Sequence, residues 1–394
     1  MTDHSVEAGD AAALARLLVS IDSRNPSLTN GAPGEAAVAL ALRDVLDSWG
    51  FRTVIADAAP GRPNVVATLG QAGQRSLILN GHLDVVGTEG MTHPPFDADI
   101  RDNRLYGRGA TDMKGGVAAM CAAAWRAAQQ GGLAGEVIVT AVADEEWASI
   151  GTAALLAGGL RADAAIVTEP TGLAIAPAHR GFAWLEIVVH GHAAHGSRYD
   201  IGVDAIRLAA HVLVEMDRLE RDVLTTITHP LLGHASLHAA TIEGGVGFST
   251  YPDRCLVRVE RRTLPGEGGM DALREAEDAM NRVRVRFPDL RAEAFLMSEQ
   301  EPSDVALDAP VVKALEKALL ACGETPRVEG LSAWTDAALL NAAGIPAVCY
   351  GPGDISLAHA DTEWVDINDI ERATNVLTRL VADWTGGRTD RWPN

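Results

Sequence analysis

The chain has 394 residues, of which 47% are hydrophobic and 22% charged, as is usual for a soluble globular protein. This length is sufficient for more than one domain. Acidic residues outnumber basic ones by 53 to 33, so the formal net charge is -20. That balance argues against nucleic acid or an anionic membrane as a partner, because binding phosphates requires clustered Lys and Arg.

No segment has the pattern of a membrane span or a targeting signal. The first residues, MTDHSVEAGD, carry early acids and no basic stretch ahead of an apolar one, unlike a secretory signal. No apolar run approaches the ~18 residues of a transmembrane helix. Four cysteines are scattered in apolar contexts without a CxxC pair, which indicates reduced core residues. We therefore expect a cytoplasmic protein.

Helices and short apolar runs alternate over the first 180 residues. Amphipathic helices are expected at 5–22 and 33–48, and an Ala-rich helix at about 114–130. Short apolar runs predict strands at 64–69, 76–81, 136–142 and 164–169. Continuous apolar strands separated by helices indicate an α/β fold with a mainly parallel sheet and helices on both faces.

The pattern changes near residue 180. A strand in FAWLEIVVHG, a helix in VDAIRLAAHVLVEMDRL, strands in HAATIEGG and DRCLVRVERR, a helix in MDALREAEDAMNRVRVRF and a strand in RAEAFLM follow in order. This βαββαβ order predicts an inserted two-layer domain. The alternation of helices and apolar strands seen in the first 180 residues then resumes, with helices at 309–321, 335–343 and 367–384 and a strand in IPAVCYG. We predict a catalytic domain of residues 1–180 and 298–394, interrupted by an inserted domain of residues 181–297.

Acidic and histidine side chains follow the predicted strands, where ligands bind in an open parallel sheet. Taken in chain order, the strands of this part of the chain are followed by His82 and Asp84, by Asp144, Glu145 and Glu146, by Glu169, and by His359. Asp112 lies just ahead of the Ala-rich helix, whose N-terminus favours a negative charge. Each residue alone has an ordinary explanation, such as a hydrogen-bonded loop histidine, a solvated acidic turn or a helix N-cap. The prediction of a site depends on their convergence.

Imidazole and carboxylate groups without a thiolate suit Zn²⁺, Co²⁺ or Mn²⁺. If Asp112 bridges two ions, each ion has three protein ligands and open positions for water and substrate, as catalytic sites do. Glu145 is then left to act as the general base. Asp84 lies two residues beyond His82 and can help to fix the tautomer of its ring. The candidate ligands are His82, Asp112, Glu146, Glu169 and His359.

Several motifs occur in order: NGHLDVV, YGRGATDMKGG, ADEEWASIGT, VTEP, and AGIPAVCYGPG followed by AHADTEWV. They resemble the two-zinc amidohydrolase and exopeptidase family of acetylornithine deacetylase, succinyl-diaminopimelate desuccinylase, aminoacylase-1 and glutamate carboxypeptidase, over nearly the whole chain. The resemblance implies that His82 and Glu169 hold one zinc. It implies that Glu146 and His359 hold the other, with Asp112 bridging, Glu145 as the base and Asp84 supporting His82.

The resemblance continues in the inserted domain. HGHAAHGSRYDIGVDAI resembles the segment whose histidine, here His195, helps to polarise the scissile carbonyl, often across a dimer interface. ERRTLPGE resembles the segment with an arginine for the substrate carboxylate. The resemblance implies that this arginine is Arg262. Strand alternation directs Arg261 and Arg262 to opposite faces, so only one of them can have the role and Arg261 stays the alternative. The Gly-rich loop 351–353, with Gly353, is also implied to contact substrate.

Two departures from the family pattern bear on the substrate. Ser249 stands where many relatives have an asparagine, and Ala148 stands where relatives usually have a glycine. Trp147, a bulky residue beside the acidic pair, is a candidate for shaping the substrate pocket.

The predicted function is hydrolysis of a linear amide, a C–N bond, in an N-acylated amino acid or related small substrate. Two zinc ions would hold the attacking water, with Glu145 as the base and a homodimer formed through the inserted domain. A dipeptidase or carboxypeptidase of the same family has the same core chemistry and stays an alternative. A non-catalytic metal-binding protein is a further alternative, although such a protein needs ligands but no base.

Overall fold

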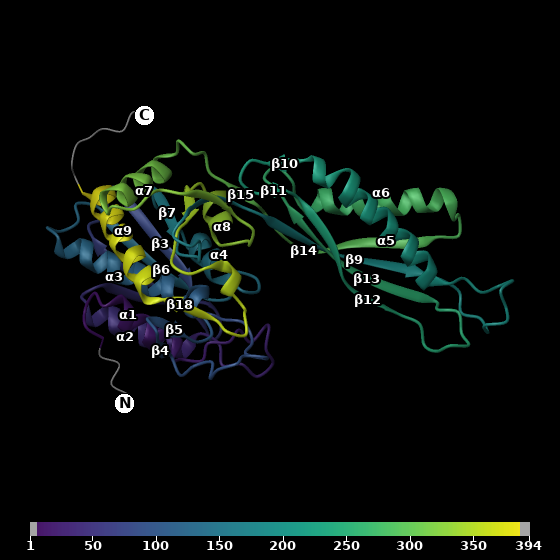
Figure 1. Ribbon diagram of the computed structural model, residues 1–394, viewed down its shortest axis with the longest axis horizontal. Helices are drawn as coiled ribbons and strands as arrows, with labels where there is room; N and C mark the ends of the chain where they lie inside the picture. Colours follow the sequence, from purple (N-terminus) through teal and green to yellow (C-terminus); the bar gives the residue numbers. More distant parts are fainter. Residues whose placement is uncertain (1–5, 387–394) are drawn as a thin grey trace. The chain divides into compact units, whose positions relative to one another are not determined.

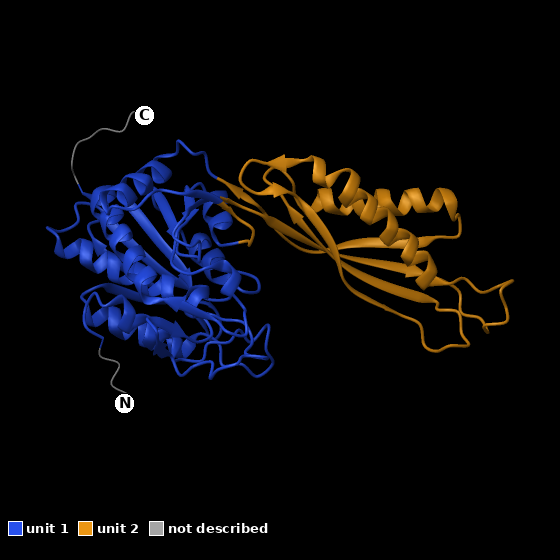
Figure 2. Ribbon diagram, in the orientation of Figure 1, with its two compact units in different colours: residues 1–177, 305–329, 335–394 blue, residues 178–304, 330–334 orange. Residues whose placement is uncertain are grey.

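The computed structural model describes residues 6–386. Residues 1–5 and 387–394, which belong to the predicted catalytic domain, lie outside the described residues. The chain divides into two compact units (Figures 1 and 2). Unit 1 comprises residues 1–177, 305–329 and 335–394, and unit 2 comprises residues 178–304 and 330–334. Unit 2 contains the predicted insertion of 181–297. It begins slightly earlier, ends slightly later and takes in the short segment 330–334.

The larger sheet is mixed and has a parallel centre. Its strand order is β1-β2-β6-β3-β7-β17-β8-β15, with β16 beside β8, within the described residues. β6, β3, β7 and β17 are parallel neighbours, and antiparallel strands flank them on both sides. The predicted α/β class is therefore confirmed, whereas the antiparallel edges were not predicted. The strands are β1 (Arg52–Ala59), β2 (Arg62–Gly70), β3 (Ser76–His82), β6 (Glu136–Val142), β7 (Ala164–Val167), β8 (Ile175–His179), β15 (Ser303–Asp304), β16 (Val328–Leu331) and β17 (Ala347–Cys349).

Helices cover both faces of this sheet. Adjacent residues of a strand point to opposite faces. On β3 the Asn80 amide donates to the Thr152 hydroxyl of α4 at 3.2 Å, whereas a Cβ on Gly81 would lie 2.9 Å from Val117 of α3. α3 packs against α9 on one face, and α4 contacts α8 on the other (Figure 1). The helices of unit 1 are α1 (Ala11–Val19), α2 (Ala36–Ser48), α3 (Gly115–Gln129), α4 (Ile150–Ala157), α7 (Pro310–Ala321), α8 (Ala337–Ala342) and α9 (Ile367–Thr385).

A small three-stranded sheet joins two segments that are far apart in sequence. β18 (Trp364–Asp366) pairs with β5 (Arg104–Tyr106), which pairs with β4 (Asp99–Arg101), both antiparallel. Strands of three residues carry too little alternation to be recognised in a sequence. Through this sheet, the chain just before Asp112 is fixed beside the chain just after His359.

Unit 2 has the predicted βαββαβ order. An antiparallel sheet with the order β12-β13-β9-β14 packs one face against α5 and α6 around a core that includes Leu185, Met216 and Val257. A two-stranded hairpin, β10 and β11, was not predicted. In the described part of the chain, no helix combines the length and apolar character needed to cross a membrane. The elements of unit 2 are β9 (Gly181–His190), α5 (Ala205–Asp222), β10 (Thr228–His229), β11 (Gly233–His234), β12 (Ser236–Gly244), β13 (Arg254–Thr263), α6 (Gly269–Arg286) and β14 (Arg291–Gln300).

Candidate metal centre

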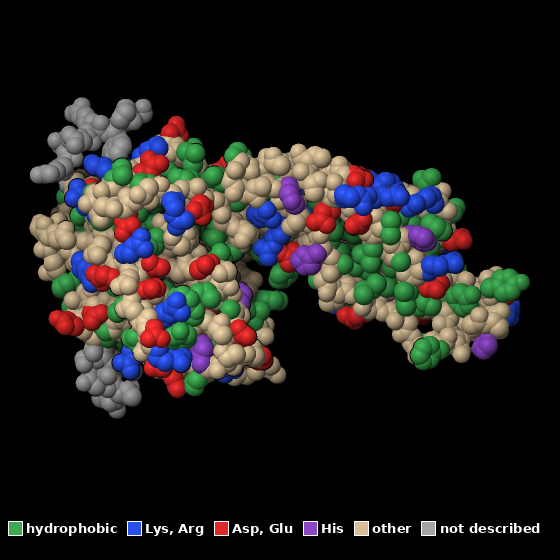
Figure 3. Space-filling view, in the orientation of Figure 1, with side chains coloured by type: hydrophobic (Ala, Val, Ile, Leu, Met, Phe, Trp, Pro, Cys, Tyr) green, Lys and Arg blue, Asp and Glu red, His purple; other side chains and the backbone are tan. Residues whose placement is uncertain are grey.

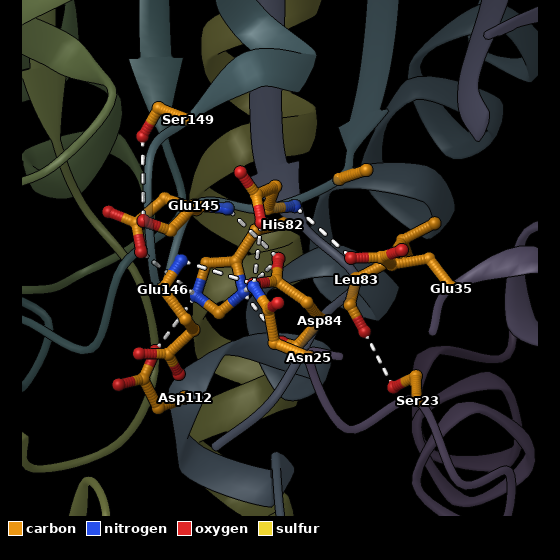
Figure 4. A network of polar contacts seen from close by, with 12 residues as sticks. Ser23, Asn25, Glu35, His82, Leu83, Asp84, Asp112, Glu145, Glu146 and Ser149 are labelled. Carbon is orange, nitrogen blue, oxygen red and sulfur yellow. Dashed lines mark hydrogen bonds and ion pairs between the residues drawn. The ribbon is translucent and has the colours of Figure 1, made fainter. Parts of the chain in front are cut away.

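The predicted ligands all lie in unit 1, close to the carboxyl ends of its central strands. β6, β3 and β7 are parallel neighbours, so residues that end or follow them gather at one edge of the sheet. Asp112 lies in the turn just before α3 (Figure 4). The other ligands come from these strand ends and from the loop after β17: His82, Glu146, Glu169 and His359.

Asp112 lies between the two predicted histidine ligands. Its Oδ1 lies 3.0 Å from Nε2 of His82, and its Oδ2 lies 3.3 Å from Nε2 of His359. The same His359 nitrogen lies 3.0 Å from Oε2 of Glu146. On the other side of His82, Nε2 lies 3.9 Å from Oε1 of Glu169. Asp112 thus lies beside both histidines. Glu146 is a further carboxylate beside His359, and Glu169 and Glu145 lie equally close to Nε2 of His82.

The donor atoms fit divalent cations. Among the described residues, His82, Asp112 and Glu146 form one compact group of possible ligands, and His82, Glu145 and Glu169 form a second. The Oε1 atom of Glu169 is buried and has no hydrogen-bond partner within residues 6–386. A buried carboxylate oxygen without a donor is costly unless a cation approaches it. The donor set of imidazoles and carboxylates is also one that Zn²⁺, Co²⁺ and Mn²⁺ accept.

The electrostatics of the cluster point the same way. Burial, and then the charge of Asp112, raise the pKa of the Glu169 carboxyl well above its usual value. Burial and the charge of Glu169 do the same for Glu145. Burial opposes charging of His359, but its hydrogen bonds to Asp112 and Glu146 prevail and raise its pKa to about 10. Without cations, Glu145, Glu169 and His359 therefore tend to bind protons. Bound cations would supply positive charge in place of those protons.

Asp84 holds the turn that carries the two adjacent glutamates. Its carboxylate accepts the backbone N–H groups of Glu145 and Glu146, both at 3.1 Å, and the Asn25 amide at 2.8 Å. Nδ1 of His82 lies 2.9 Å from the backbone oxygen of Asp84 and 3.6 Å from its carboxylate. The expected support of the His82 ring thus runs through the main chain of Asp84.

The third acid of the turn, Asp144, is part of a buried polar network. Its backbone has a φ of 69°, a left-handed conformation that is uncommon outside glycine. Its carboxylate accepts hydrogen bonds from Arg62 at 2.8 Å and from Asn25 at 3.0 Å, and Glu35 pairs with the same arginine at 2.6 Å. These contacts hold the turn in its unusual conformation. The sequence interpretation missed Asn25, Arg62 and Glu35, because each acts through contacts that are distant in sequence.

A further buried acid lies close to the cluster. Asp336 precedes α8, is 1% exposed and accepts the Thr152 hydroxyl at 2.6 Å. Burial raises its pKa to about 6, and its charge contributes to the raised pKa of Glu145. No motif marks Asp336 in the sequence, and its partner Thr152 is far from it in the chain.

The remaining predicted residues are placed in different parts of the chain. His195 and Arg262 belong to unit 2, so they are not part of the unit 1 cluster. His195 is exposed, with Nδ1 2.8 Å from the Ser197 hydroxyl. Gly353 is in unit 1 with a φ of 93°, and a Cβ there would lie 3.1 Å from the Thr111 side chain. Its loop therefore passes close to the turn of Asp112.

The two neighbouring arginines of β13 point to opposite faces of the sheet. Arg261 is 1% exposed and pairs with Glu275 at 2.9 Å and Glu267 at 3.0 Å. Arg262 is partly exposed, pairs with Glu260 and lies over the Phe182 ring. Of the two, only Arg262 has a side chain that solvent can reach.

Comparisons with known proteins agree with this arrangement. A family model described as peptidase family M20/M25/M40 matches residues 78–383. The acetylornithine deacetylase of Myxococcus xanthus is 33% identical over 340 residues, which cover 84% of this chain and 87% of that protein. The N-formyl-4-amino-5-aminomethyl-2-methylpyrimidine deformylase of Bacillus subtilis (strain 168) is 29% identical over 420 residues, which cover 96% of this chain and 95% of that protein.

The fold has close counterparts among solved structures. A tripeptidase from Staphylococcus aureus aligns with a TM-score of 0.80 at 19% sequence identity, covering 96% of this chain and 99% of that one. At this identity the likeness supports the fold. The family model and the relatives in sequence carry the assignment: the chain belongs to the M20/M25/M40 peptidase family of metallohydrolases, which confirms the family predicted from its motifs.

Proposed function

We propose that the protein hydrolyses the amide bond of an N-acylated amino acid or a related small substrate, with two divalent ions held at the cluster. The observation that carries this proposal is the position of Asp112, with one carboxylate oxygen toward each histidine. That position suits a bridging ligand. His82 and Glu169 would complete one ion site, and Glu146 and His359 the other. Zn²⁺ is the proposed metal, with Co²⁺ or Mn²⁺ as substitutes.

Glu145 is the proposed general base. Bound divalent ions would polarise the substrate carbonyl and lower the pKa of a water toward ~7. Glu145 lies among the ligands, with Oε2 3.9 Å from Nε2 of His82, and is the carboxylate of this group that we do not assign to a metal. Its pKa is raised by burial and by Glu169, which suits a carboxylate that takes a proton from water and returns it to the leaving amine.

The proposed roles in unit 2 concern the substrate. His195 would donate to the developing oxyanion, and Arg262 would bind the carboxylate of an amino-acid substrate. Gly353 would line the substrate site beside the Asp112 turn. The exposure of His195 and Arg262 supports these roles, since both side chains are available to a ligand.

A substrate panel tests the proposed reaction. Protein loaded with zinc or cobalt would be assayed against N-acetyl amino acids including N-acetylornithine, N-succinyl diamino acids, an N-formyl aminomethylpyrimidine, dipeptides and tripeptides. We expect the N-acyl amino acids to give the highest kcat/KM. Zinc-loaded protein that cleaves none of these amides would overturn the proposal and favour a non-catalytic metal-binding protein.

Peptide hydrolysis is the second candidate. The tripeptidase of the same fold favours it, and breaking a peptide bond requires the same base and ligands. The two candidates differ only in what binds around the cluster. A kcat/KM higher for dipeptides or tripeptides than for every N-acyl amino acid would select this alternative.

We also propose a homodimer formed through unit 2. Hydrophobic side chains gather on the face of unit 2 seen in Figure 3, and three aromatic or aliphatic residues of its loops are largely exposed: Tyr199, Val246 and Phe248. Such exposure is uncommon unless a partner covers it. Sedimentation velocity would show a dimer for the wild-type chain and a weaker one for Phe248→Ser. Of the four free cysteines, Cys121, Cys255 and Cys349 are buried as expected, whereas Cys322 is exposed, so the expectation that all four are core residues was wrong for Cys322. Free thiols support the proposed cytoplasmic location.

A further inference from the structure

We propose that Arg108 and Glu363 form a crossed brace that sets the position of Asp112 relative to His359. This inference rests on the proposed two-metal centre and assigns two positioning residues to it. Each brace residue is four positions from one ligand and holds the other ligand. Arg108 precedes Asp112 but contacts His359, and Glu363 follows His359 but contacts Asp112.

Glu363 binds backbone N–H groups of the turn that carries Asp112. It is fully buried, and its Oε1 accepts the backbone N–H groups of Thr111 at 3.0 Å and of Asp112 at 3.1 Å. The hydroxyl of Thr111 adds a bond to the backbone oxygen of Trp364 at 2.5 Å. The position of the Asp112 backbone therefore depends on the segment that carries His359.

Arg108 closes the brace in the other direction. Its Nη1 donates to Oε2 of Glu363 at 2.6 Å, its Nε donates to the backbone oxygen of Gly87 at 2.9 Å, and its Nη2 lies 3.5 Å from the backbone oxygen of His359. The side chain is only 3% exposed. One guanidinium thus joins the loop after β3, the Glu363 carboxylate and the loop of His359.

Of the five predicted ligands, His359 depends most on contacts that fix its backbone. The other ligands lie in or beside strands and a helix, whereas His359 lies in a loop and has a φ of 60°. That left-handed conformation is unfavourable for a histidine unless its surroundings fix it. Its side chain is also half exposed, so packing supplies little constraint. The backbone contact from Arg108 and the pairing of β18 with β5 on the far side of Glu363 supply it.

A contribution to overall stability does not by itself explain the buried ion pair of Arg108 and Glu363. A buried ion pair contributes little to stability, because removing two charges from water offsets their attraction. The carboxylate and the guanidinium here both extend to backbone atoms of predicted ligands. We therefore expect loss of the Arg108 contact to affect chiefly the ion held by His359, and loss of Glu363, which holds the bridging Asp112, to affect both ions.

Metal titration of variants tests the brace. Apo protein would be titrated with Zn²⁺ by calorimetry and with Co²⁺ by visible absorption, for the wild type, Glu363→Gln and Arg108→Lys. His82→Gln and His359→Gln serve as references that each remove one ligand. We expect Arg108→Lys to raise the Kd of one ion and Glu363→Gln to raise the Kd of both ions by at least about tenfold, the effect typical of residues that orient metal ligands. For Arg108→Lys, the cobalt spectrum at one equivalent should match the pattern of His359→Gln and not that of His82→Gln.

Glu275→Gln is the matched control. It removes a carboxylate from the buried guanidinium of Arg261 in unit 2, with no predicted ligand in contact. We expect a lower midpoint of thermal unfolding with both Kd values unchanged. Brace variants that behave like this control would overturn the brace, because they would show a role in stability only. Arg108→Lys retains the positive charge, so it supplies the test if Glu363→Gln does not fold.

The wild-type titration separates this inference from the proposed function. Wild type that binds a single ion would overturn the two-metal centre, and the brace with it. Wild type that binds two ions, together with brace variants of unchanged Kd and unchanged cobalt spectra, would overturn the brace and leave the proposed function standing.

Discussion

The carboxylate of Asp84 accepts a hydrogen bond from the backbone N–H of Glu145, with 3.1 Å between nitrogen and oxygen. The residue two positions after one predicted ligand thus fixes the main chain of the proposed base. A second bond, from the N–H of Glu146, fixes the neighbouring ligand in the same way. The position of the base and that of His82 are therefore coupled through one side chain.

Asp84→Asn should lower turnover while leaving metal bound. An asparagine has one acceptor oxygen and a donor group, so it cannot accept from all three N–H donors that Asp84 serves. We expect kcat to fall by about 10- to 100-fold, with two zinc ions still present by elemental analysis. Asp163→Asn is the control, since that carboxylate also accepts a strand amide, that of Ser76 at the far end of β3. A normal kcat in Asp84→Asn would contradict this role.

Glu145→Gln should abolish turnover with the metal sites intact. The amide has nearly the shape of the carboxylate but cannot take a proton from water, so kcat should fall by at least about a hundredfold. Zinc content and thermal stability are measured alongside. Glu146→Gln is the comparison variant, which should lose both activity and bound zinc. Zinc-replete Glu145→Gln with near-normal kcat would refute the assignment of the base.

Removing metal should abolish activity reversibly and destabilise unit 1. Without cations, several acids stand close together at one buried site, and only protonation relieves their repulsion. Treatment with a chelator should therefore lower both turnover and the midpoint of thermal unfolding, and Zn²⁺, Co²⁺ or Mn²⁺ should restore them. Asp112→Asn should lose affinity for both ions, whereas His359→Gln should lose affinity for one. Full activity in metal-free protein would contradict the proposed function.

Substitution of Arg261 should lower stability, whereas substitution of Arg262 should weaken substrate binding. Arg261→Ala leaves Glu267 and Glu275 without their buried partner, so we expect unit 2 to lose about 2 kcal/mol or more of unfolding free energy. Arg262→Ala should raise KM for carboxylate-bearing substrates by about tenfold or more with little change in stability. The measurements are denaturant unfolding and steady-state kinetics. The reverse pattern would show that the assignment of the two arginines is wrong.

His179 should make unit 2 sensitive to mild acid. Burial lowers its pKa from 6.5 to about 4, so the folded protein binds fewer protons than the unfolded chain between these values. The free energy of unfolding therefore falls as the pH drops through that window, by up to about 3 kcal/mol. Hydrogen exchange of β8 and β9 should accelerate from pH 6.5 to 4 more in the wild type than in His179→Gln, after correction for the intrinsic rate. Equal pH dependence in the two proteins would contradict this expectation.

The sequence predicted the long, apolar elements of the fold and missed the short ones. β3 and β6 are short, mostly apolar and buried segments whose length favours a strand, and α9 has a strong helical period. β1 lies at an edge and is half exposed along its length, so its pattern resembles that of a loop. β4, β5 and β18 are too short to show any pattern. Their existence depends on pairing between segments that are far apart in the chain.

The sequence predicted the residues of the candidate centre better than it predicted their supports. Strand ends and motifs identified the ligands, because each ligand follows or precedes an element with a clear pattern. Arg108, Glu363 and Asn25 act on backbone atoms of distant segments, and no local pattern marks such contacts. Arg108 and Glu363 lie within the motifs YGRGATDMKGG and AHADTEWV, which mark these segments but not the contacts between them.

The order in which unit 1 is synthesised follows from its division by unit 2. Translation makes His82, Asp112, Glu146 and Glu169 before the insertion begins and His359 only after it ends. A growing chain on the ribosome therefore presents its acids and one histidine long before the second histidine and Glu363 exist. The proposed centre can take its final form only when the last segment joins, so binding of both proposed ions would require the segment that carries His359.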